Sequence, residues 1–172
     1  IEGPTTRYTA VPIEEFCDNK IRKLNEAKHE LIRIIPRKKE DIEGYITIKG
    51  QDHILDKMRN MISDAKERIY ISASRQVIEK FYKEINDTVK RKLKVVLITD
   101  ESINIDGVMV YLIEKSEHQI RLIIDSNHVL TGDIDAGEHS TCLYSKKKNL
   151  IDLLKDSLKN EIKLIEIMKG KE

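Results

Sequence analysis

The sequence is poor in cysteine, contains no glycine-rich phosphate-binding loop, and shows no internal repeat and no low-complexity tract. Its two cysteines, Cys17 and Cys142, are too few for a disulfide framework or a cysteine metal cluster. No segment is long and apolar enough to cross a bilayer, and no signal peptide is recognisable. These absences favour a reducing, cytoplasmic setting and give no indication of a metal or a cofactor.

Charged residues are plentiful but balanced, with 31 Lys and Arg against 30 Asp and Glu and a net charge of +1. No overall field therefore favours nucleic acid or an anionic membrane as a partner. The 172 residues, 40% hydrophobic and 35% charged, suit one globular domain plus an extension. Because the first residue is Ile1 rather than Met, we expect a longer protein whose N-terminal part is missing here.

The first predicted helix runs from Pro12 to about Ile35. Pro12 suits the first helical position, acidic residues follow in the first turn, and Pro36 disfavours helix in the residue before it. Residues spaced four and three apart predict a heptad seam, as in a two-helix coiled coil between subunits. The seam residues are Cys17, Ile21, Leu24, Lys28, Leu31 and Ile35. The alternative is that this helix packs on its own domain, through residues off the seam such as Ile13 and Phe16.

After a charged linker at residues 36–43, strand and helix patterns alternate. Strands are predicted at 44–49, 68–74 and 93–99, with amphipathic helices at 51–66 and 76–91 between them. This alternation predicts an α/β fold with right-handed crossovers and a parallel core. Two further strands, at 108–113 and 140–145, and a long helix with one apolar face after Lys148 complete a domain predicted over residues 44–172, behind a linker and helix at 1–36.

The stretch from 117 to 133, EHQIRLIIDSNHVLTGD, predicts two short buried strands joined by a tight hairpin at Ser126 and Asn127. His118 and Asp125 lie seven residues apart and bracket the first strand. Their spacing resembles the H-x-K-x4-D signature of the phospholipase D superfamily, with Ile120 at the lysine position.

In the full motif, the resemblance implies a histidine nucleophile, a lysine that binds phosphate oxygens and an aspartate that supports the fold. Ile120 has no charge and no donor for a transferring phosphoryl group, and Arg121 points to the other face of the strand. The superfamily pairs two such motifs, whereas this chain has one. We therefore expect no catalytic residue. The alternatives are a single-motif phosphodiesterase or nuclease using His118, or a chance spacing of ordinary strand and turn residues.

Three further stretches resemble one family of regulators. The first, GPTTRYTAVPIEEF at residues 3–16, is similar to the junction in TrmB-family transcriptional regulators where a winged helix-turn-helix passes into a coiled-coil helix. The matching positions are Gly3, Pro4, Arg7, Tyr8, Ala10, Val11, Pro12, Glu14 and Glu15. Residues 50–58 and 69–73 resemble the next part of the family, a phospholipase D-like domain that has lost catalysis and senses an effector.

This resemblance implies an α/β fold in which a phospholipase D-like mixed sheet is flanked by helices and preceded by an N-terminal coiled-coil dimerisation helix. It implies a homodimer and a small-molecule effector, with DNA bound only through a domain absent from this sequence. Members that sense sugars carry a further C-terminal β-rich piece, which is missing here, so a sugar is only one candidate effector. A structural dimerisation module without a ligand is a further alternative.

Ligands of open α/β sheets gather at the carboxyl ends of the strands. We expect the effector site at that edge, beside the degenerate motif. The residues expected to line it are Ser72, Ser74, Thr99, Asp100, His118, Asp125 and Asp133. An acid at position 133 disfavours a phosphate and suits a neutral polyol or a cation. The alternative is that these residues are ordinary strand-end caps and turn residues.

Overall fold

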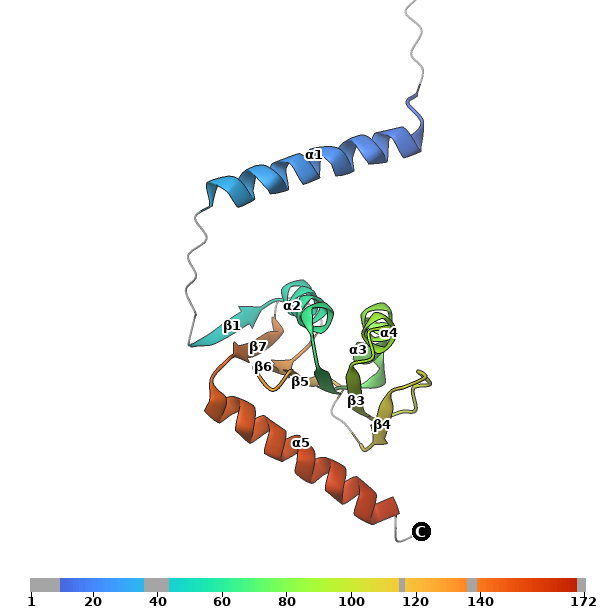
Figure 1. Cartoon of the computed structure of the whole chain (residues 1–172), viewed down its shortest axis with the longest axis vertical. Helices are drawn as coiled ribbons and strands as arrows, with labels where there is room; N and C mark the ends of the chain where they lie inside the picture. The colour runs from blue at the N-terminus through green and yellow to red at the C-terminus, as the bar shows by residue number, and fades with distance from the viewer. Residues whose placement is uncertain (1–9, 36–43, 115–116, 136–138, 170–172) are drawn as a thin grey trace, which may run out of the picture. The chain divides into compact units, whose positions relative to one another are not determined.

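The computed structural model describes residues 10–35, 44–114, 117–135 and 139–169. The chain divides into two compact units, Ile1–Asp41 and Ile42–Glu172. Figure 1 labels the helices and strands of both.

The first unit contains α1, which spans Ile13–Ile34. Its predicted ends are confirmed to within one residue: Pro12 immediately precedes the first helical residue, and Ile35 is extended with ψ 115°. Ile35 leaves the helical conformation because the next residue in the sequence is a proline. None of the 22 residues of α1 is buried, although the helix is strongly amphipathic.

The second unit is built on a seven-stranded sheet in the order β1-β7-β6-β5-β2-β3-β4. The strands are β1 Tyr45–Lys49, β2 Arg68–Ser72, β3 Lys94–Thr99, β4 Met109–Leu112, β5 Gln119–Ile124, β6 His128–Asp133 and β7 Thr141–Ser145. Strands β2, β3 and β4 are parallel to one another, and every other neighbouring pair is antiparallel. The sheet is therefore mixed.

The predicted parallel core is smaller than expected because β1 does not join β2 and β3. It pairs with β7 at the far edge of the sheet instead. The burial of β1 alternates along the strand, as suits an edge position, whereas β5, which takes the place beside β2, is buried at most positions.

Helices cover both faces of the sheet (Figure 1). One face carries α2 Gln51–Asp64, α3 Arg75–Glu79 and α4 Tyr82–Lys90, and the other carries α5 Lys148–Lys169. The sequence predicts one continuous helix over 76–91, which is wrong: the chain breaks at Phe81, where φ is −116° and ψ is 16°. The Phe81 side chain is fully buried in the core beneath α2 and α4.

Strand alternation divides the side chains of the sheet between two apolar cores. Ile120, Leu122 and Ile124 of β5 belong to the core beneath α2 to α4, whereas Ile123 belongs to the core beneath α5. Arg121 also faces α5, so the predicted orientation of this arginine away from position 120 is confirmed.

Arg121 ties β5 to α5. Its guanidinium donates to Ser157 Oγ at 3.2 Å and to both carboxylate oxygens of Glu161 at 3.1 and 3.0 Å. The two charged side chains are only 13% and 16% exposed. Hydrogen bonds between ionised groups are stronger than neutral ones, and this shielded pair with the Ser157 contact fixes where α5 lies on the sheet.

The hairpin between β5 and β6 is confirmed, but its turn is centred on Asp125 and Ser126, one residue earlier than predicted. Asp125 and Ser126 both have positive φ, 52° and 55°, and the Asn127 N–H donates to the Ile124 carbonyl at 2.9 Å. Two successive residues at positive φ are typical of a type I′ turn, whose twist matches that of paired strands.

Candidate functional site

The strand register places most of the predicted ligand-binding residues at one edge of the sheet. Ser72, at the end of β2, pairs with Ile98 near the end of β3 and with Arg121 near the start of β5. Gln119 pairs with Asp133, so β6 ends at the same edge. The residues gathered there are Ser72, Ser74, Thr99, Asp100, His118 and Asp133. They spread over four adjacent strands, about 14 Å at the usual strand spacing, so a small ligand can contact only part of the set.

Asp125 lies at the opposite end of β5, contrary to the expectation that it joins this set. A six-residue strand, about 20 Å long, separates it from His118. Its carboxylate accepts the backbone N–H groups of Lys66, Glu67 and Arg68 at 2.9, 2.8 and 2.9 Å. Asp125 therefore fixes the segment that leads into β2 next to the hairpin between β5 and β6.

Replacing Asp125 with alanine should lower the free energy of unfolding by roughly 1–3 kcal/mol, because three backbone donors lose a charged acceptor. Burial raises the pKa of Asp125, but the three N–H donors outweigh it, and the pKa lies below its usual value. A lowered pKa stabilises the folded state above the pKa of the unfolded chain, about 3.9, and this contribution is lost as the pH falls through the folded pKa. Urea unfolding at pH 7 and pH 3 should show the difference between wild type and variant shrinking at the lower pH. A difference that stays constant would contradict this role.

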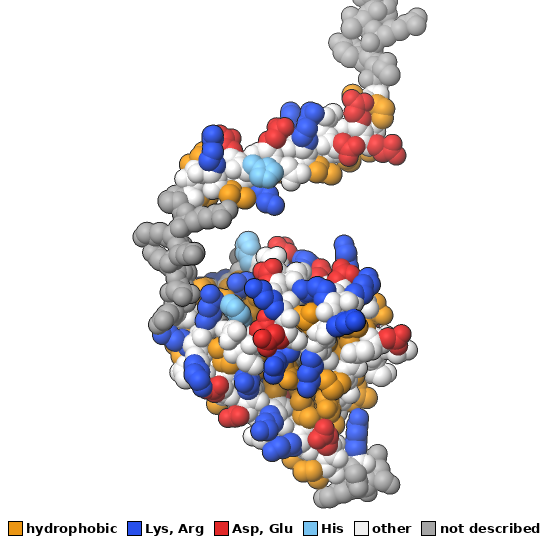
Figure 2. All heavy atoms as spheres, in the orientation of Figure 1, with side chains coloured by type: hydrophobic (Ala, Val, Ile, Leu, Met, Phe, Trp, Pro, Cys, Tyr) orange, Lys and Arg blue, Asp and Glu red, His pale blue; other side chains and the backbone are white. Residues whose placement is uncertain are grey.

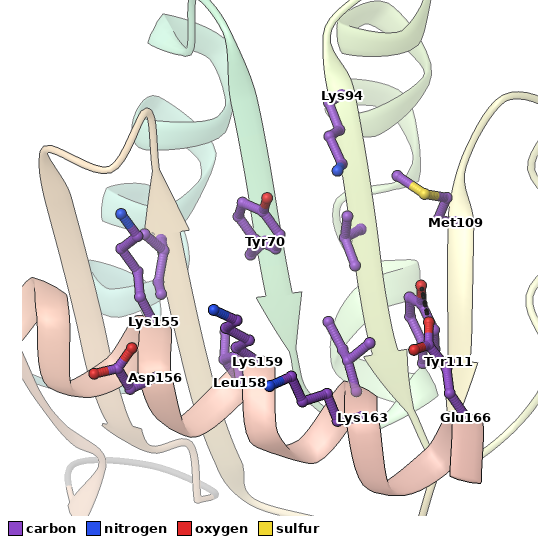
Figure 3. A pocket seen from close by; sticks show the side chains of 13 residues that line it. Tyr70, Lys94, Met109, Tyr111, Lys155, Asp156, Leu158, Lys159, Lys163 and Glu166 are labelled. Atoms are coloured by element: carbon purple, nitrogen blue, oxygen red, sulfur yellow. Dashed lines mark hydrogen bonds between the residues drawn. The ribbon is translucent and has the colours of Figure 1, made fainter.

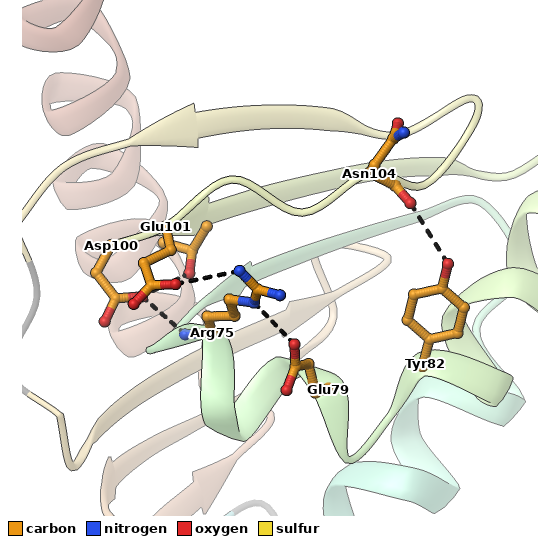
Figure 4. A network of polar contacts seen from close by, with 7 residues as sticks. Arg75, Glu79, Tyr82, Asp100, Glu101 and Asn104 are labelled. Carbon is orange, nitrogen blue, oxygen red and sulfur yellow. Dashed lines mark hydrogen bonds and ion pairs between the residues drawn. The ribbon is translucent and has the colours of Figure 1, made fainter.

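Asp100 anchors the start of α3 (Figure 4). Asp100 Oδ1 accepts the Arg75 backbone N–H at 2.8 Å and the Thr99 hydroxyl at 3.1 Å. Burial raises the pKa of Asp100, whereas these hydrogen bonds lower it, and the net shift is downward. Arg75 also bonds Glu79 at 2.8 Å and Glu101 at 3.1 Å. The polar side chains of Thr99 and Asp100 therefore already form hydrogen bonds that stabilise the fold.

The two serines at the end of β2 have different surroundings. The Ser74 hydroxyl donates to the Glu117 carbonyl at 3.0 Å and links β2 to the segment before β5. Ser72 is 1% exposed, and its Oγ has no hydrogen-bond partner among the described residues. Ser72 lies opposite Arg121 in the register, on the side of the sheet that faces α5. It therefore does not share a face with Thr99.

His118 and Asp133 lie at the solvent-accessible part of the edge. The His118 side chain is 55% exposed, with Nδ1 3.2 Å from the Ile134 carbonyl oxygen and 3.3 Å from Asp135 Oδ1. Asp133 is exposed at the end of β6. Burial, and then the Asp133 carboxylate, raises the pKa of the neighbouring Cys142 thiol to about 12. Sequence reasoning missed Asp135, which no motif marks.

Position 120 lies in the apolar core and is closed to solvent. Ile120 is fully buried and pairs with Gly132 of β6. A Cβ at Gly132 would lie 2.2 Å from the Thr141 carbonyl oxygen of β7, so the strands close tightly here because this residue is a glycine. Where the phospholipase D motif has a phosphate-binding lysine, this chain therefore has part of its core.

A separate cavity of about 520 Å³ lies between α5 and strands β2 to β5 (Figure 3). None of the residues predicted to bind a ligand lines it. The sequence did not indicate this cavity because its lining combines one face of α5 with one or two residues from each of four strands, and these elements meet only in the folded chain.

Other classes of site have less support. Within the described ranges, no three His, Cys, Asp or Glu side chains are grouped as a metal site would require. Over the same ranges, no helix combines the length and apolarity needed to cross a membrane. On the face of the second unit shown in Figure 2, positive and negative side chains are interspersed rather than gathered by sign.

The sequence and the fold match known proteins. A protein-family model described as "Transcriptional regulator TrmB, EBD N-terminal subdomain" matches residues 44–157, most of the second unit. The uncharacterized protein YrhO of Bacillus subtilis (strain 168) is 24% identical over 178 residues, which cover 97% of this chain and 65% of YrhO. The chain thus spans somewhat less than two thirds of the length of that relative.

Among solved structures, TrmBL2, described as an archaeal chromatin protein with a novel mode of DNA binding, superposes with a TM-score of 0.59 at 16% identity, covering 86% of this chain and 64% of TrmBL2. Nuc from Salmonella typhimurium, a phospholipase D family member, has a TM-score of 0.51 at 15% identity. The match covers 68% of this chain and 93% of Nuc. NucT from Helicobacter pylori has a TM-score of 0.50 at 16% identity, and the match covers 69% of this chain and 96% of NucT. The expected phospholipase D-like mixed sheet is confirmed.

Proposed function

Since this chain belongs to the TrmB family of transcriptional regulators, we propose that it is the effector-sensing and dimerisation part of a bacterial or archaeal regulator. The family match over residues 44–157 carries the proposal. Binding of a small molecule to the second unit modulates DNA binding by a helix-turn-helix domain outside this sequence. Such a regulator acts where the DNA is, in the cytoplasm.

The exposed apolar residues of α1 support dimerisation through this helix. Ile21, Leu24 and Leu31 are 56%, 70% and 56% exposed, and apolar side chains are visible on the surface of α1 in Figure 2. A single amphipathic helix of this length is only marginally stable in water. Pairing two copies along the heptad seam buries these side chains, and Lys28 within the seam sets the register at some cost in stability.

The regulatory mechanism that we propose is a population shift. In the dimer, a ligand can bind one arrangement of the two subunits' α/β domains more tightly than another. It then favours that arrangement, and with it one angle or spacing of the paired α1 helices. DNA-reading domains joined to α1 then move relative to half-sites one helical turn apart.

We place the effector at the open part of the strand edge, beside His118, Asp133 and Asp135. Carboxylates bind hydroxyl groups and cations and repel phosphate, which favours a neutral polyol or a cation. A thermal-shift screen tests this proposal, since a ligand at 100 times its dissociation constant adds about 2.7 kcal/mol of stability. His118→Ala and Asp133→Ala should weaken binding of the ligand found, whereas Asp106→Ala, a matched exposed acid on a distant loop, should not. Unchanged affinity in both site variants would move the effector elsewhere.

The competing function is a single-motif phosphodiesterase or nuclease. The buried Ile120 and the pairing of Arg121 with Glu161 argue against it, because neither residue can stabilise a transferring phosphoryl group. The loss of one such contact costs roughly 10²–10³-fold in rate.

We therefore predict no turnover of a chromogenic phosphodiester above the uncatalysed rate. Turnover that is abolished in His118→Ala and retained in His139→Ala would establish the enzyme instead.

A further inference from the structure

We propose that the cavity between α5 and strands β2 to β5 binds a small amphipathic anion, a molecule with a flat apolar body and one acid group. This site is separate from the His118 edge and does not depend on the function proposed above. Its volume of about 520 Å³ falls within the range of roughly 300–1,000 Å³ typical of small-molecule sites.

The inner surface of the cavity is apolar. Its floor consists of Val96 and Ile123 from the sheet and Leu158 and Ile162 from α5. Two tyrosines, Tyr70 of β2 and Tyr111 of β4, are part of the lining, and Figure 3 shows both rings on the side of the sheet that faces α5. Aromatic rings above an apolar floor favour a flat, apolar ligand body.

The rim of the cavity is cationic. Lys94 reaches it from β3, and Lys155, Lys159 and Lys163 reach it from α5 (Figure 3). None of these four lysines forms an ion pair with any residue in the described part of the chain.

The three α5 lysines follow one another at intervals of four residues, so they lie along one face of the helix. They therefore line the cavity as a row.

The two acidic residues at the cavity do not neutralise the rim. The Tyr111 hydroxyl donates to Glu166 at 3.3 Å, so one oxygen of this carboxylate already accepts a hydrogen bond. Burial, and then the charge of Glu166, raises the pKa of Tyr111, which keeps its hydroxyl protonated as a donor. Asp156 is the other acid, which leaves four cations against two carboxylates. The excess positive charge selects an acid over a neutral or cationic molecule of the same shape.

The first test compares 2-naphthoate with neutral 2-naphthol as probes by titration calorimetry. We expect naphthoate to bind and naphthol to bind at least tenfold more weakly. Lys159→Gln together with Lys163→Gln should raise the naphthoate Kd by about 3- to 30-fold, the effect expected for two partly exposed ion pairs. Lys80→Gln together with Lys90→Gln, the same charge change on the opposite face of the sheet, should leave the Kd unchanged.

The second test locates the probe. With 3-fluorotyrosine incorporated, naphthoate should shift the fluorine resonances of Tyr70 and Tyr111 and leave those of Tyr45 and Tyr82 in place. Any one of three results would overturn the proposal: no naphthoate binding, equal affinity in the Lys159/Lys163 variant and its control, or shifts confined to Tyr45 and Tyr82.

Discussion

Replacing Arg121 with alanine is expected to lower the free energy of unfolding by about 3–5 kcal/mol, the cost of breaking a buried ion pair by removing one partner. The guanidinium makes three hydrogen bonds to α5, and both charged side chains are largely shielded from water. Its loss leaves the Glu161 carboxylate between α5 and the sheet without this cation. Urea unfolding at pH 7, followed by circular dichroism, measures the effect.

Two comparisons make the Arg121 result specific. Arg68→Ala removes an arginine whose ion pair with Glu67 is exposed, and it should cost less than about 1 kcal/mol. The double variant Arg121→Met, Glu161→Leu should recover most of the lost stability, because apolar residues of similar size often replace a buried pair without loss. A cost for Arg121→Ala no larger than that for Arg68→Ala would show that the pair does not hold α5 on the sheet.

Substitution of Leu24 and Leu31 by glutamate is expected to convert a dimer into monomers. Each change places a charge at an apolar seam position of α1, and two like charges would then face each other across the pair at each level. The mass in solution, measured by light scattering at several protein concentrations, should fall by half.

The matched control for the seam is Asn19→Glu with His29→Glu. These changes add the same number of acidic residues to α1, at positions off the seam, so the dimer should persist. A dimer that survives the Leu24 and Leu31 changes would place the interface elsewhere on the chain.

Local features of the fold were predictable because short-range physics determines them. The end of α1 before Pro36 follows from the steric effect of proline on the residue before it. The orientation of Arg121 follows from the alternation of side chains in a strand. The hairpin after Ile124 follows from two short apolar runs separated by turn residues.

Features that depend on long-range pairing were not predictable. Nothing local to β1 indicates that it pairs with β7, almost a hundred residues away, rather than with β2. The motif spacing predicts Asp125 beside His118, although a strand of six residues between them places them at opposite edges of the sheet. The cavity under α5 is assembled from strands and a helix that meet only in the folded chain, so no single stretch could indicate it.

Oxidative cross-linking at Cys17 tests whether two copies pair in parallel through α1 as parts of one regulator. Cys17 is exposed on the seam, and parallel pairing brings it opposite its counterpart. Cys142 is buried and its thiol pKa is raised to about 12, so it should not react. We expect mild oxidation to give a disulfide-linked dimer that Cys17→Ser abolishes and Cys142→Ser does not. A dimer in light scattering that gives no Cys17 cross-link would contradict parallel pairing through α1.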